Sequence, residues 1–331
     1  MTPPTLTCRV CGSRSIELLG RKRGEFIPRD FEFHRCRDCG LVFVEPFSGF
    51  AIYNDAYYRG DGPDPYVDYE TEYRDWRRSD RGTEFDDLAG IAEAHACAGE
   101  RRREKGEGSE VFPSPFSLLP SPDAQRPAAA EPLRWLDFGC GAGGFLKYRR
   151  ERGTLAGRPL ELTGHDLGSY AELLQRVDGF RILDLDQVSR EPDARYDIIS
   201  MIEVIEHLPD PAAALALIAR LLKPGGLLLL TTGNLESPIA RRHGIHYRYC
   251  APEIHVSLFN PRCLARLYRS VGLEPFTVRY RGAVKFKVVK SLRHRPLLRT
   301  LARGCLVFPL TVRLVDALYG VSAMPCAVKR S

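Results

Sequence analysis

The sequence has no run of about eighteen or more apolar residues, and its N-terminus has no apolar core of the signal-peptide kind. These absences exclude an ordinary membrane-spanning helix and predict a protein that is not secreted. Acids are nearly missing from residues 282–331, where ten Lys or Arg accompany only Asp316, a segment charge of +9. The whole chain carries +6, so residues 1–281 carry −3. Because the basic charge is confined to this segment, we expect no nucleic-acid partner.

The chain has 331 residues, of which 44% are hydrophobic, which suffices for one large domain and a smaller one. Ten cysteines in a protein that is not secreted are expected to be reduced thiols or metal ligands. We therefore expect a cytoplasmic protein. Composition and charge divide it into a ribbon at 1–50, a tyrosine-rich helical connector at 51–98, a Pro/Ala/Arg-rich linker at 99–131, and a larger domain at 132–331 with a basic helical insertion at 283–320.

Four of the cysteines form two Cys-x-x-Cys pairs, each followed by a glycine. Two residues between thiolates let both reach one ion, and the glycine permits the tight turn that aims backbone amides at sulfur. Such a closed four-thiolate site leaves no position for a substrate, so its role is in folding. The predicted ligands of a structural Zn²⁺ are Cys8, Cys11, Cys36 and Cys39.

From Leu133 onward, strands and helices alternate, which predicts a doubly wound α/β sheet with helices on both faces. Asp210-Pro211 and Asn260-Pro261 are typical helix starts. The last strand, predicted to be antiparallel, lies in 322–329. The other predicted strands are 133–138, 160–165, 180–185, 196–202, 227–231 and 275–280.

A glycine-rich loop follows the first of these strands, in the order Asp137-Phe-Gly139-Cys-Gly141-Ala-Gly143. Glycines there let the backbone approach a ligand closely and adopt positive φ. Dinucleotide-binding loops use glycines at a different spacing. An acid at the end of the strand would repel a pyrophosphate and would suit a ligand with a cationic amino group.

This loop resembles that of the class I S-adenosylmethionine-dependent methyltransferases, in which it lies against the methionine part of the cofactor. The resemblance implies a Rossmann-like seven-stranded sheet and S-adenosylmethionine as cofactor. The resemblance also implies an acid that binds the ribose after the second strand and an acid near the adenine after the third strand. The second of these acids is Asp184 or Asp186. The implied cofactor-binding residues are Asp137, Gly139, Gly141, Gly143, Asp166, Asp184, Ile202 and Glu203.

The segment after the fourth strand, Glu203-Val-Ile-Glu206-His207, is similar to that of the ubiquinone-type O-methyltransferases. There Glu-x-x-Glu-His resembles a divalent-metal site, which would make Mg²⁺ a second ion and His207 part of the catalytic group. In the alternative interpretation, Glu203 faces the cofactor and His207 caps the loop.

A second candidate group lies in the long segment after the fifth strand. His255, four residues before Phe259, matches a motif of zinc-containing methyltransferases that act on nucleotide-linked sugars. Glu253 departs from that motif, because Ile254 separates it from His255. We expect His255 and Glu253 to be catalytic, with His255 as general base, or alternatively His255 to hold the loop through backbone hydrogen bonds.

Two further segments leave alternatives open. Tyrosines 53, 57, 58, 66, 69 and 73 form either a lid over the pocket or aromatic packing between the ribbon and the main domain. Residues 290–318 form an amphipathic helical insertion that packs on the sheet or a second copy, or contacts an anionic membrane or lipid-linked substrate.

The resulting hypothesis is a methyltransferase for a small-molecule acceptor, a sugar or secondary metabolite. An O-methyltransferase of a lipidic or aromatic hydroxyl is the first alternative. An RNA methyltransferase or a scaffold without activity fits less well.

Overall fold

The computed structural model describes most of the chain. The described residues are 6–63, 68–79, 81–105, 131–278, 309–319 and 325–330, with the single positions 297, 302 and 305. Tyr66, residues 106–130 of the predicted linker and most of the predicted insertion lie outside them.

The larger sheet has eight strands in the order β11-β12-β9-β8-β4-β6-β5, with β7 also paired to β6. Neighbouring strands are parallel from β9 through β8, β4 and β6 to β7, whereas β12 is antiparallel to both β9 and β11. This order confirms the predicted Rossmann-like methyltransferase sheet, including its antiparallel last strand. The strands are β4 (Leu133–Phe138), β5 (Thr154–Leu155), β6 (Arg158–His165), β7 (Arg181–Leu183), β8 (Tyr196–Ile202), β9 (Leu222–Thr231), β11 (Leu273–Phe276) and β12 (Cys326–Lys329).

Several strand boundaries differ from those predicted; β6, for example, starts at Arg158, two residues before its predicted start. β7 ends at Leu183 because Asp184 caps the next helix, α6 (Leu185–Ser189). β9 starts at Leu222 rather than 227, and a register shift against β8 accommodates the Pro-Gly-Gly turn. β11 starts at Leu273, two residues before its predicted start.

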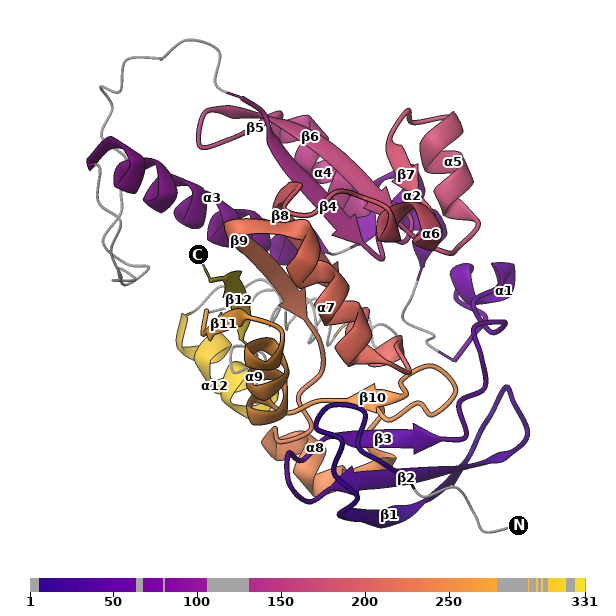
Figure 1. Cartoon of the computed structure of the whole chain (residues 1–331). Coiled ribbons are helices and arrows are strands. Elements are labelled where there is room, and N and C mark those ends of the chain that lie inside the picture. The colour runs from indigo at the N-terminus through magenta and orange to yellow at the C-terminus, as the bar shows by residue number, and fades with distance from the viewer. Residues whose placement is uncertain are drawn as a thin grey trace.

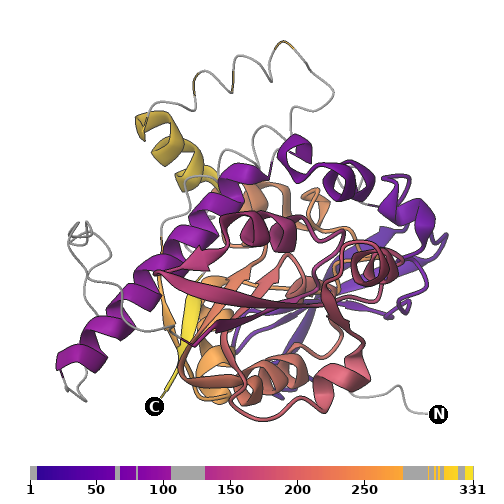
Figure 2. The same cartoon turned by 90° about the horizontal axis from the view of Figure 1, so that it is seen from above.

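Helices cover both faces of the sheet (Figure 2), as alternating strand side chains require. Trp135 faces a core shared with α3 (Gly82–Lys105) and α4 (Gly144–Arg152). Leu136 faces the opposite core, to which α7 (Pro211–Leu221) and α9 (Pro261–Ser270) contribute. Helix α5 (Tyr170–Arg176) packs beside β7 through Leu174.

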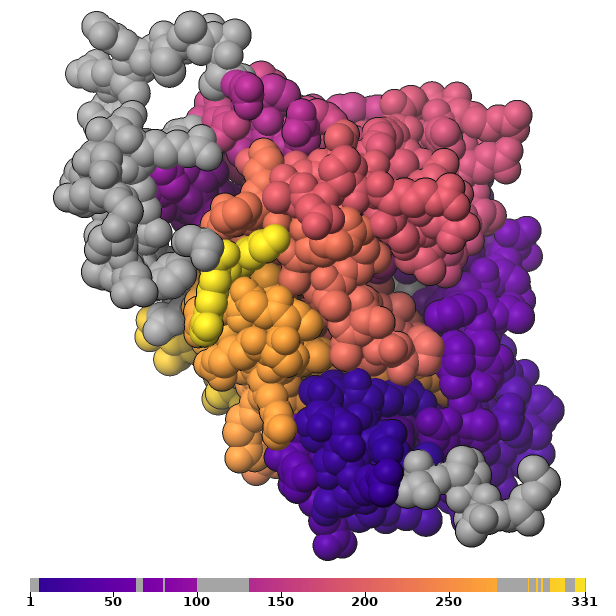
Figure 3. Space-filling view, in the orientation of Figure 1, coloured from indigo at the N-terminus to yellow at the C-terminus, as the bar shows by residue number. Residues whose placement is uncertain are grey.

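A second, four-stranded sheet forms the N-terminal ribbon, in the order β1-β2-β3-β10. Its fourth strand is β10 (Ser257–Leu258), which comes from the segment after β9 and pairs antiparallel with β3 (Figure 1). The ribbon and the main sheet also share a core, and Figure 3 shows the ribbon surface meeting that of α9. The predicted domain boundaries remain predictions, but the ribbon is completed by residues far along the chain. The remaining ribbon strands are β1 (Ile16–Arg23), β2 (Asp30–Cys36) and β3 (Val42–Glu45).

Short helices connect the ribbon to the sheet. The tyrosine-rich connector forms α1 (Asp55–Tyr58), α2 (Tyr69–Arg74) and the 3₁₀ turn η1 (Trp76–Ser79) before α3. Helix α3 extends to Lys105, so the first residues of the predicted linker are helical. The other short elements are η2 (Ile205–His207), α8 (Pro238–His243) and η3 (Gly244–His246).

Within the predicted insertion, α12 (Pro309–Tyr319) is helical. Leucines at 310, 314 and 318 lie exposed along it, whereas Val312 is buried. Across the described residues, no helix combines the length and the apolar character needed to cross a membrane.

Candidate functional site

The glycine loop lies where β4 ends and α4 begins. Gly139, Gly141 and Gly143 all have positive φ, between 53° and 78°. A Cβ at Gly139 would collide with Val204, and one at Gly141 would meet the Tyr69 ring at 2.6 Å. The amides of Gly139 and Cys140 donate to the His165 carbonyl at 2.7 and 2.9 Å, which ties the loop to β6. The loop therefore needs glycine for both its conformation and its close contacts.

Asp137 lies at the end of β4 and is only 2% exposed. It accepts a 2.6 Å hydrogen bond from the Ser200 hydroxyl, which in turn accepts one from the Trp135 indole at 2.9 Å. Burial raises the pKa of Asp137 to about 7, against the lowering effects of the Ser200 hydrogen bond and the Arg81 charge. A cationic group placed beside this carboxyl would favour its ionised form.

The predicted ribose acid, Asp166, lies beside this loop. Its two carboxylate oxygens accept hydrogen bonds from the Gly141 amide at 2.8 Å and the Gly168 amide at 2.7 Å. Tyr58 of the connector also donates to it at 3.3 Å. Asp166 thus lies at the carboxyl edge of the sheet, where ligands bind in doubly wound folds.

The predicted adenine residue, Asp184, follows β7 at the same edge. Asp184 accepts from the Gln187 amide at 2.7 Å and so caps α6, while the Gln187 side chain accepts from the Asp184 amide. Asp186, the alternative, is exposed in the first turn of that helix. Of the two acids, Asp184 directly follows the strand. Its role in binding the adenine stays a prediction.

Tyrosines of the connector cover the glycine loop. Tyr57 and Tyr58 are 4% and 6% exposed and pack with Tyr53, Tyr69 and Ile254 of the later segment. Tyr69 also lies against Gly141 of the loop. The connector tyrosines therefore pack between the glycine loop and the later segment that carries Ile254, and their action as a lid stays a prediction.

Two charged connector residues that the sequence interpretation missed lie beside the same loop. Glu72 is 5% exposed and lies against Gly144, the first residue of α4. It pairs with Arg81 at 3.4 Å, and Arg81 also pairs with the buried Glu84 at 3.0 Å. No local motif signals them, because their proximity to the loop arises only when α2 and α3 fold over the sheet.

The chain turns sharply after β8. Ile202 ends that strand, and Glu203 adopts φ +56°, which is rare for a residue with a side chain. Val204 then lies against Gly139, which links this turn to the glycine loop. The predicted cofactor residues Ile202 and Glu203 therefore adjoin the loop.

The next three-residue turn brings together two groups that the sequence suggested separately. Glu206, His207 and His255 offer ligating atoms that all lie within 4.8 Å of one another. The ring centroids of His207 and His255 are 4.8 Å apart, and the Tyr249 ring lies 4.3 Å from that of His255. We call Glu206, His207 and His255, with Tyr249, the histidine cluster.

Hydrogen bonds orient both imidazoles. His255 Nδ1 lies 2.6 Å from the Tyr249 carbonyl, and His207 Nδ1 lies 3.1 Å from the Ile254 carbonyl. Because a carbonyl only accepts, the Nδ1–H of His255 donates to Tyr249, which leaves Nε2 as the acceptor atom of that ring. The Tyr53 hydroxyl lies 2.7 Å from His207 Nδ1 and extends the cluster to the connector. Both rings are thus oriented by hydrogen bonds, and His255 offers Nε2 as a proton acceptor.

Glu206 is fully buried, and burial together with the charge of Glu203 raises its pKa to about 8. Its oxygens accept hydrogen bonds from Tyr249 at 2.6 Å and Thr232 at 2.8 Å. Glu203 is outside the ligand group, contrary to the predicted Glu203–Glu206–His207 set. Two imidazoles and one carboxyl that already accepts two hydroxyls do not fit Mg²⁺, which prefers oxygen ligands in octahedral geometry.

The side chain of Glu253, predicted to be catalytic, contacts the ribbon. Its Oε1 accepts hydrogen bonds from the ribbon amides of Phe26 at 2.7 Å and Ile27 at 3.1 Å. The side chain is 4% exposed. The carboxylate is thus directed to the turn between β1 and β2, which gives Glu253 a structural contact in place of a proton-transfer role.

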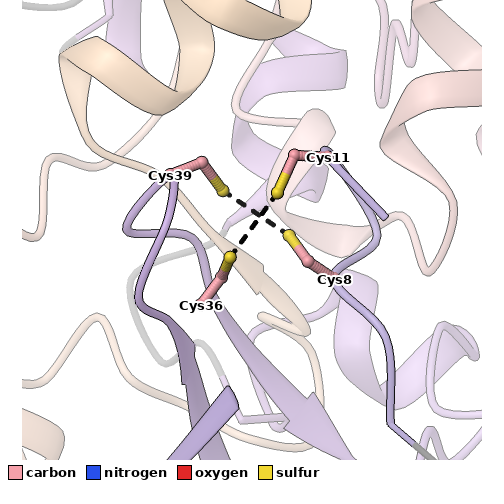
Figure 4. Close-up of side chains that lie close together, drawn as sticks. All are labelled: Cys8, Cys11, Cys36 and Cys39. Atoms are coloured by element: carbon pink, nitrogen blue, oxygen red, sulfur yellow. Dashed lines mark hydrogen bonds between the residues drawn. The ribbon is translucent and has the colours of Figure 1, made fainter. Parts of the chain in front are cut away.

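The four ribbon cysteines point toward one another (Figure 4). Cys8 and Cys39 sulfurs are 3.5 Å apart, as are those of Cys11 and Cys36. Four sulfurs at about 2.3 Å from a tetrahedral Zn²⁺ would be about 3.8 Å apart, so the group fits that ion. Gly12 and Gly40 have positive φ of 69° and 79°, as the turns require. A fifth sulfur, that of Cys263 on α9, lies 3.9 Å from Cys39, a contact that the sequence did not indicate.

Comparisons with known proteins find sequence relatives for the part of the chain that forms most of the larger sheet. Residues 115–278 match the family described as a methyltransferase domain. The chain is 30% identical over 160 residues to the ubiquinone biosynthesis O-methyltransferase of Bordetella pertussis, covering 44% of this chain and 64% of that protein. It is 34% identical over 107 residues to the protein of that name from Pseudomonas aeruginosa, covering 30% and 44%. The chain thus spans less than two thirds of the length of these curated relatives.

Among solved structures, a SAM-dependent methyltransferase from Aquifex aeolicus matches with a TM-score of 0.34 and 17% identity, covering 46% of this chain and 79% of that one. The [4+2]-cyclase SpnF matches with a TM-score of 0.37 and 19% identity, covering 60% and 76%.

Proposed function

The chain carries a class I S-adenosylmethionine-dependent methyltransferase domain, and we propose that it is an enzyme that methylates a hydroxyl of a small molecule. The observation that carries the proposal is the histidine cluster at the carboxyl edge of the sheet, one turn away from the glycine loop. Val204 touches Gly139, and two residues later the chain reaches Glu206 and His207. A methyl-donor loop next to oriented imidazoles suits an acceptor that must lose a proton.

The cofactor side rests on the glycine loop and its acids. S-adenosylmethionine, when bound, supplies an electrophilic methyl group on a positively charged sulfonium. Asp137 would hold the cationic amino end, Asp166 the ribose and Asp184 the adenine, with Gly139, Gly141 and Gly143 leaving room for the backbone to approach. Tyr58 and Tyr69 cover this side and would exclude water from it.

On the acceptor side, His255 and His207 would take the proton from the hydroxyl at Nε2. The hydrogen bond from His255 Nδ1 to the Tyr249 carbonyl would hold that ring with Nε2 as the proton acceptor, and His207 Nδ1 lies against the Ile254 carbonyl and the Tyr53 hydroxyl. Tyr53 contacts His207 and would close the acceptor side when the connector is in place. The catalytic residues we propose are therefore His255 and His207, without Glu253.

For the acceptor class we keep a sugar or secondary-metabolite hydroxyl as the first candidate. An alcohol needs a base to take its proton and binds Mg²⁺ poorly. The two imidazoles would supply such a base, and the donor set does not fit that ion.

A lipidic or aromatic hydroxyl is the second candidate, supported by two observations. The relatives named above carry the name ubiquinone biosynthesis O-methyltransferase. Leu310, Leu314 and Leu318 are 78%, 65% and 47% exposed along one stripe of α12, within the segment of charge +9. Such a stripe suits an anionic membrane surface. Co-sedimentation with vesicles of anionic lipid at low salt tests it, and a chain that stays in the supernatant removes this candidate.

The test of function uses methyl-labelled S-adenosylmethionine. The full chain is incubated with a polar metabolite extract and, separately, with a lipid extract, and labelled products are identified by mass. We expect label in an O-methyl product of one extract. Binding of S-adenosylmethionine without any labelled product, or label only on RNA, would contradict the proposal.

A further inference from the structure

The segment from Tyr249 to Asn260, which carries His255, is held from the ribbon side by several groups. Arg9, inside the first Cys-x-x-Cys turn, donates to the Val256 carbonyl at 2.9 Å and to the Val44 carbonyl at 3.0 Å. It also pairs with Glu45 at 2.6 Å. One guanidinium thus joins a cysteine turn, the strand β3 and the segment that carries His255.

A second contact joins the other end of the ribbon to the same segment. Glu253 accepts hydrogen bonds from the amides of Phe26 and Ile27 in the β1–β2 turn. Lys22 of β1 donates to the Cys250 carbonyl at 2.9 Å. The ribbon therefore holds the segment at Cys250 and Glu253, within Tyr249–His255, as well as at Val256 just after it.

The second cysteine turn is tied to the end of the segment. Asn260 donates through Nδ2 to the Gly40 carbonyl at 3.0 Å, while its Oδ1 accepts from the Cys263 amide and caps α9. Between these ties, β10 pairs with β3. Figure 1 shows β10 lying between the ribbon and the main sheet.

The Val256 peptide connects the ribbon directly to the histidine cluster. Its carbonyl accepts from Arg9, and its amide donates to the Glu206 carbonyl at 2.8 Å. Val256 follows His255, whose own amide donates to the Ala251 carbonyl at 2.8 Å. A shift of the ribbon would therefore move the backbone that carries His255.

We infer that the Cys₄ ribbon positions His255 against Glu206 and His207, with Arg9 and Glu253 as the positioning residues. This inference rests on the proposed function for its catalytic meaning. A ribbon needed only for folding would require its cysteines and its core. It would not require hydrogen bonds that join a cysteine turn and a buried carboxylate to the segment that carries the proposed base.

The test compares three variants of the full, zinc-loaded chain. Arg9→Ala removes the tie from the cysteine turn, and Glu253→Gln weakens the tie to the β1–β2 turn. Arg21→Ala is the matched control, because Arg21 is an exposed ribbon arginine whose ion-pair partner, Glu32, lies within the ribbon. Each variant is measured for zinc content, for S-adenosylmethionine affinity, for amide hydrogen exchange over 249–260 and for the ring ¹⁵N signals of His255.

We expect Arg9→Ala and Glu253→Gln to raise exchange over 249–260 by at least about tenfold and to shift or broaden the His255 ring signals. Zinc content and cofactor affinity should stay within about twofold, and Arg21→Ala should resemble the unmodified chain. Unchanged exchange and unchanged His255 signals in both variants would overturn the inference. Should Arg9→Ala lose its zinc, Glu253→Gln, which lies outside the cysteine turns, decides by the same two measurements.

The proposed function fails differently. An unmodified chain that does not bind S-adenosylmethionine would remove the methyltransferase proposal, while the exchange and ring measurements would still decide whether the ribbon positions His255.

Discussion

Among the residues that the structure describes, two groups of ligating side chains lie close together, and they differ in what already occupies their donor atoms. The four ribbon cysteines are alike, come from two tight turns and lie 3.5 Å apart in pairs. In the histidine cluster, Glu206 already accepts two hydroxyl hydrogen bonds and both Nδ1 atoms lie on carbonyls. Closeness alone therefore does not make a metal site. The first group suits a soft, tetrahedral ion, and the second suits proton transfer.

The largest expected effect breaks the first group. Cys36→Ser should abolish zinc binding and lower the free energy of unfolding by more than about 4 kcal/mol, because metal binding and folding of such ribbons are linked. Zinc content and denaturant unfolding measure this. Cys305→Ser, at an exposed cysteine, is the control and should change neither. A Cys36→Ser chain that keeps one zinc and its stability would show that the four thiols are free.

The second effect breaks the histidine cluster without touching the ribbon. His255→Ala should lower turnover about 10²- to 10⁴-fold, since it removes a general base, while cofactor affinity and zinc content stay unchanged. Turnover is measured with the acceptor found by label transfer. His246→Ala, at an exposed histidine of the same segment, should keep full activity. Full activity of His255→Ala would assign the base elsewhere.

The third prediction sharpens the contrast through pH. The pKa of Asp137 is raised to about 7 in the free protein, mainly by burial. A cationic cofactor favours the ionised carboxylate, so its affinity should be constant above pH 8 and fall about tenfold per unit below pH 7. Calorimetric titration between pH 5 and 9 measures it. Asp137→Asn should bind more weakly and show a flat profile, and an equally steep profile in that variant would assign the titration to another group.

The smallest effect concerns the support of the cluster. Tyr249→Phe removes the hydroxyl that donates to Glu206 and accepts from the Gly233 amide at 2.7 Å. Leaving these buried groups without that partner should cost about 1–3 kcal/mol of unfolding free energy, with zinc content unchanged. Thermal unfolding checks this, and a variant as stable as the unmodified chain would indicate that water replaces the hydroxyl.

Features encoded by local spacing could be predicted from the sequence. The glycine loop, the acids at strand ends and the two Cys-x-x-Cys turns each depend on residues within a few positions, and the doubly wound sheet followed from the alternation of strands and helices. Asp166 and the four cysteines accordingly lie where the sequence suggested.

Features that depend on distant contacts could not be predicted. The pairing of His207 with His255 joins residues 48 positions apart through a long segment without periodicity. Strand β10 has two residues, which is too short for any alternating pattern. Glu253 was expected in the catalytic group although it departs from the motif that His255 matches. Its Oε1 instead accepts hydrogen bonds from two ribbon amides more than 220 residues away in the chain.

Strand β10 is synthesised long after β3, the strand with which it pairs, and this order matters during translation. On the ribosome, β3 ends at Glu45, yet the strand that covers its edge begins only at Ser257. At about 5–20 residues per second, roughly 10–40 s separate the two. During that interval the nascent ribbon exposes an unpaired strand edge, a surface prone to wrong pairing with other chains. Early metal binding by the four thiols would stabilise the nascent ribbon until its last strand has been synthesised.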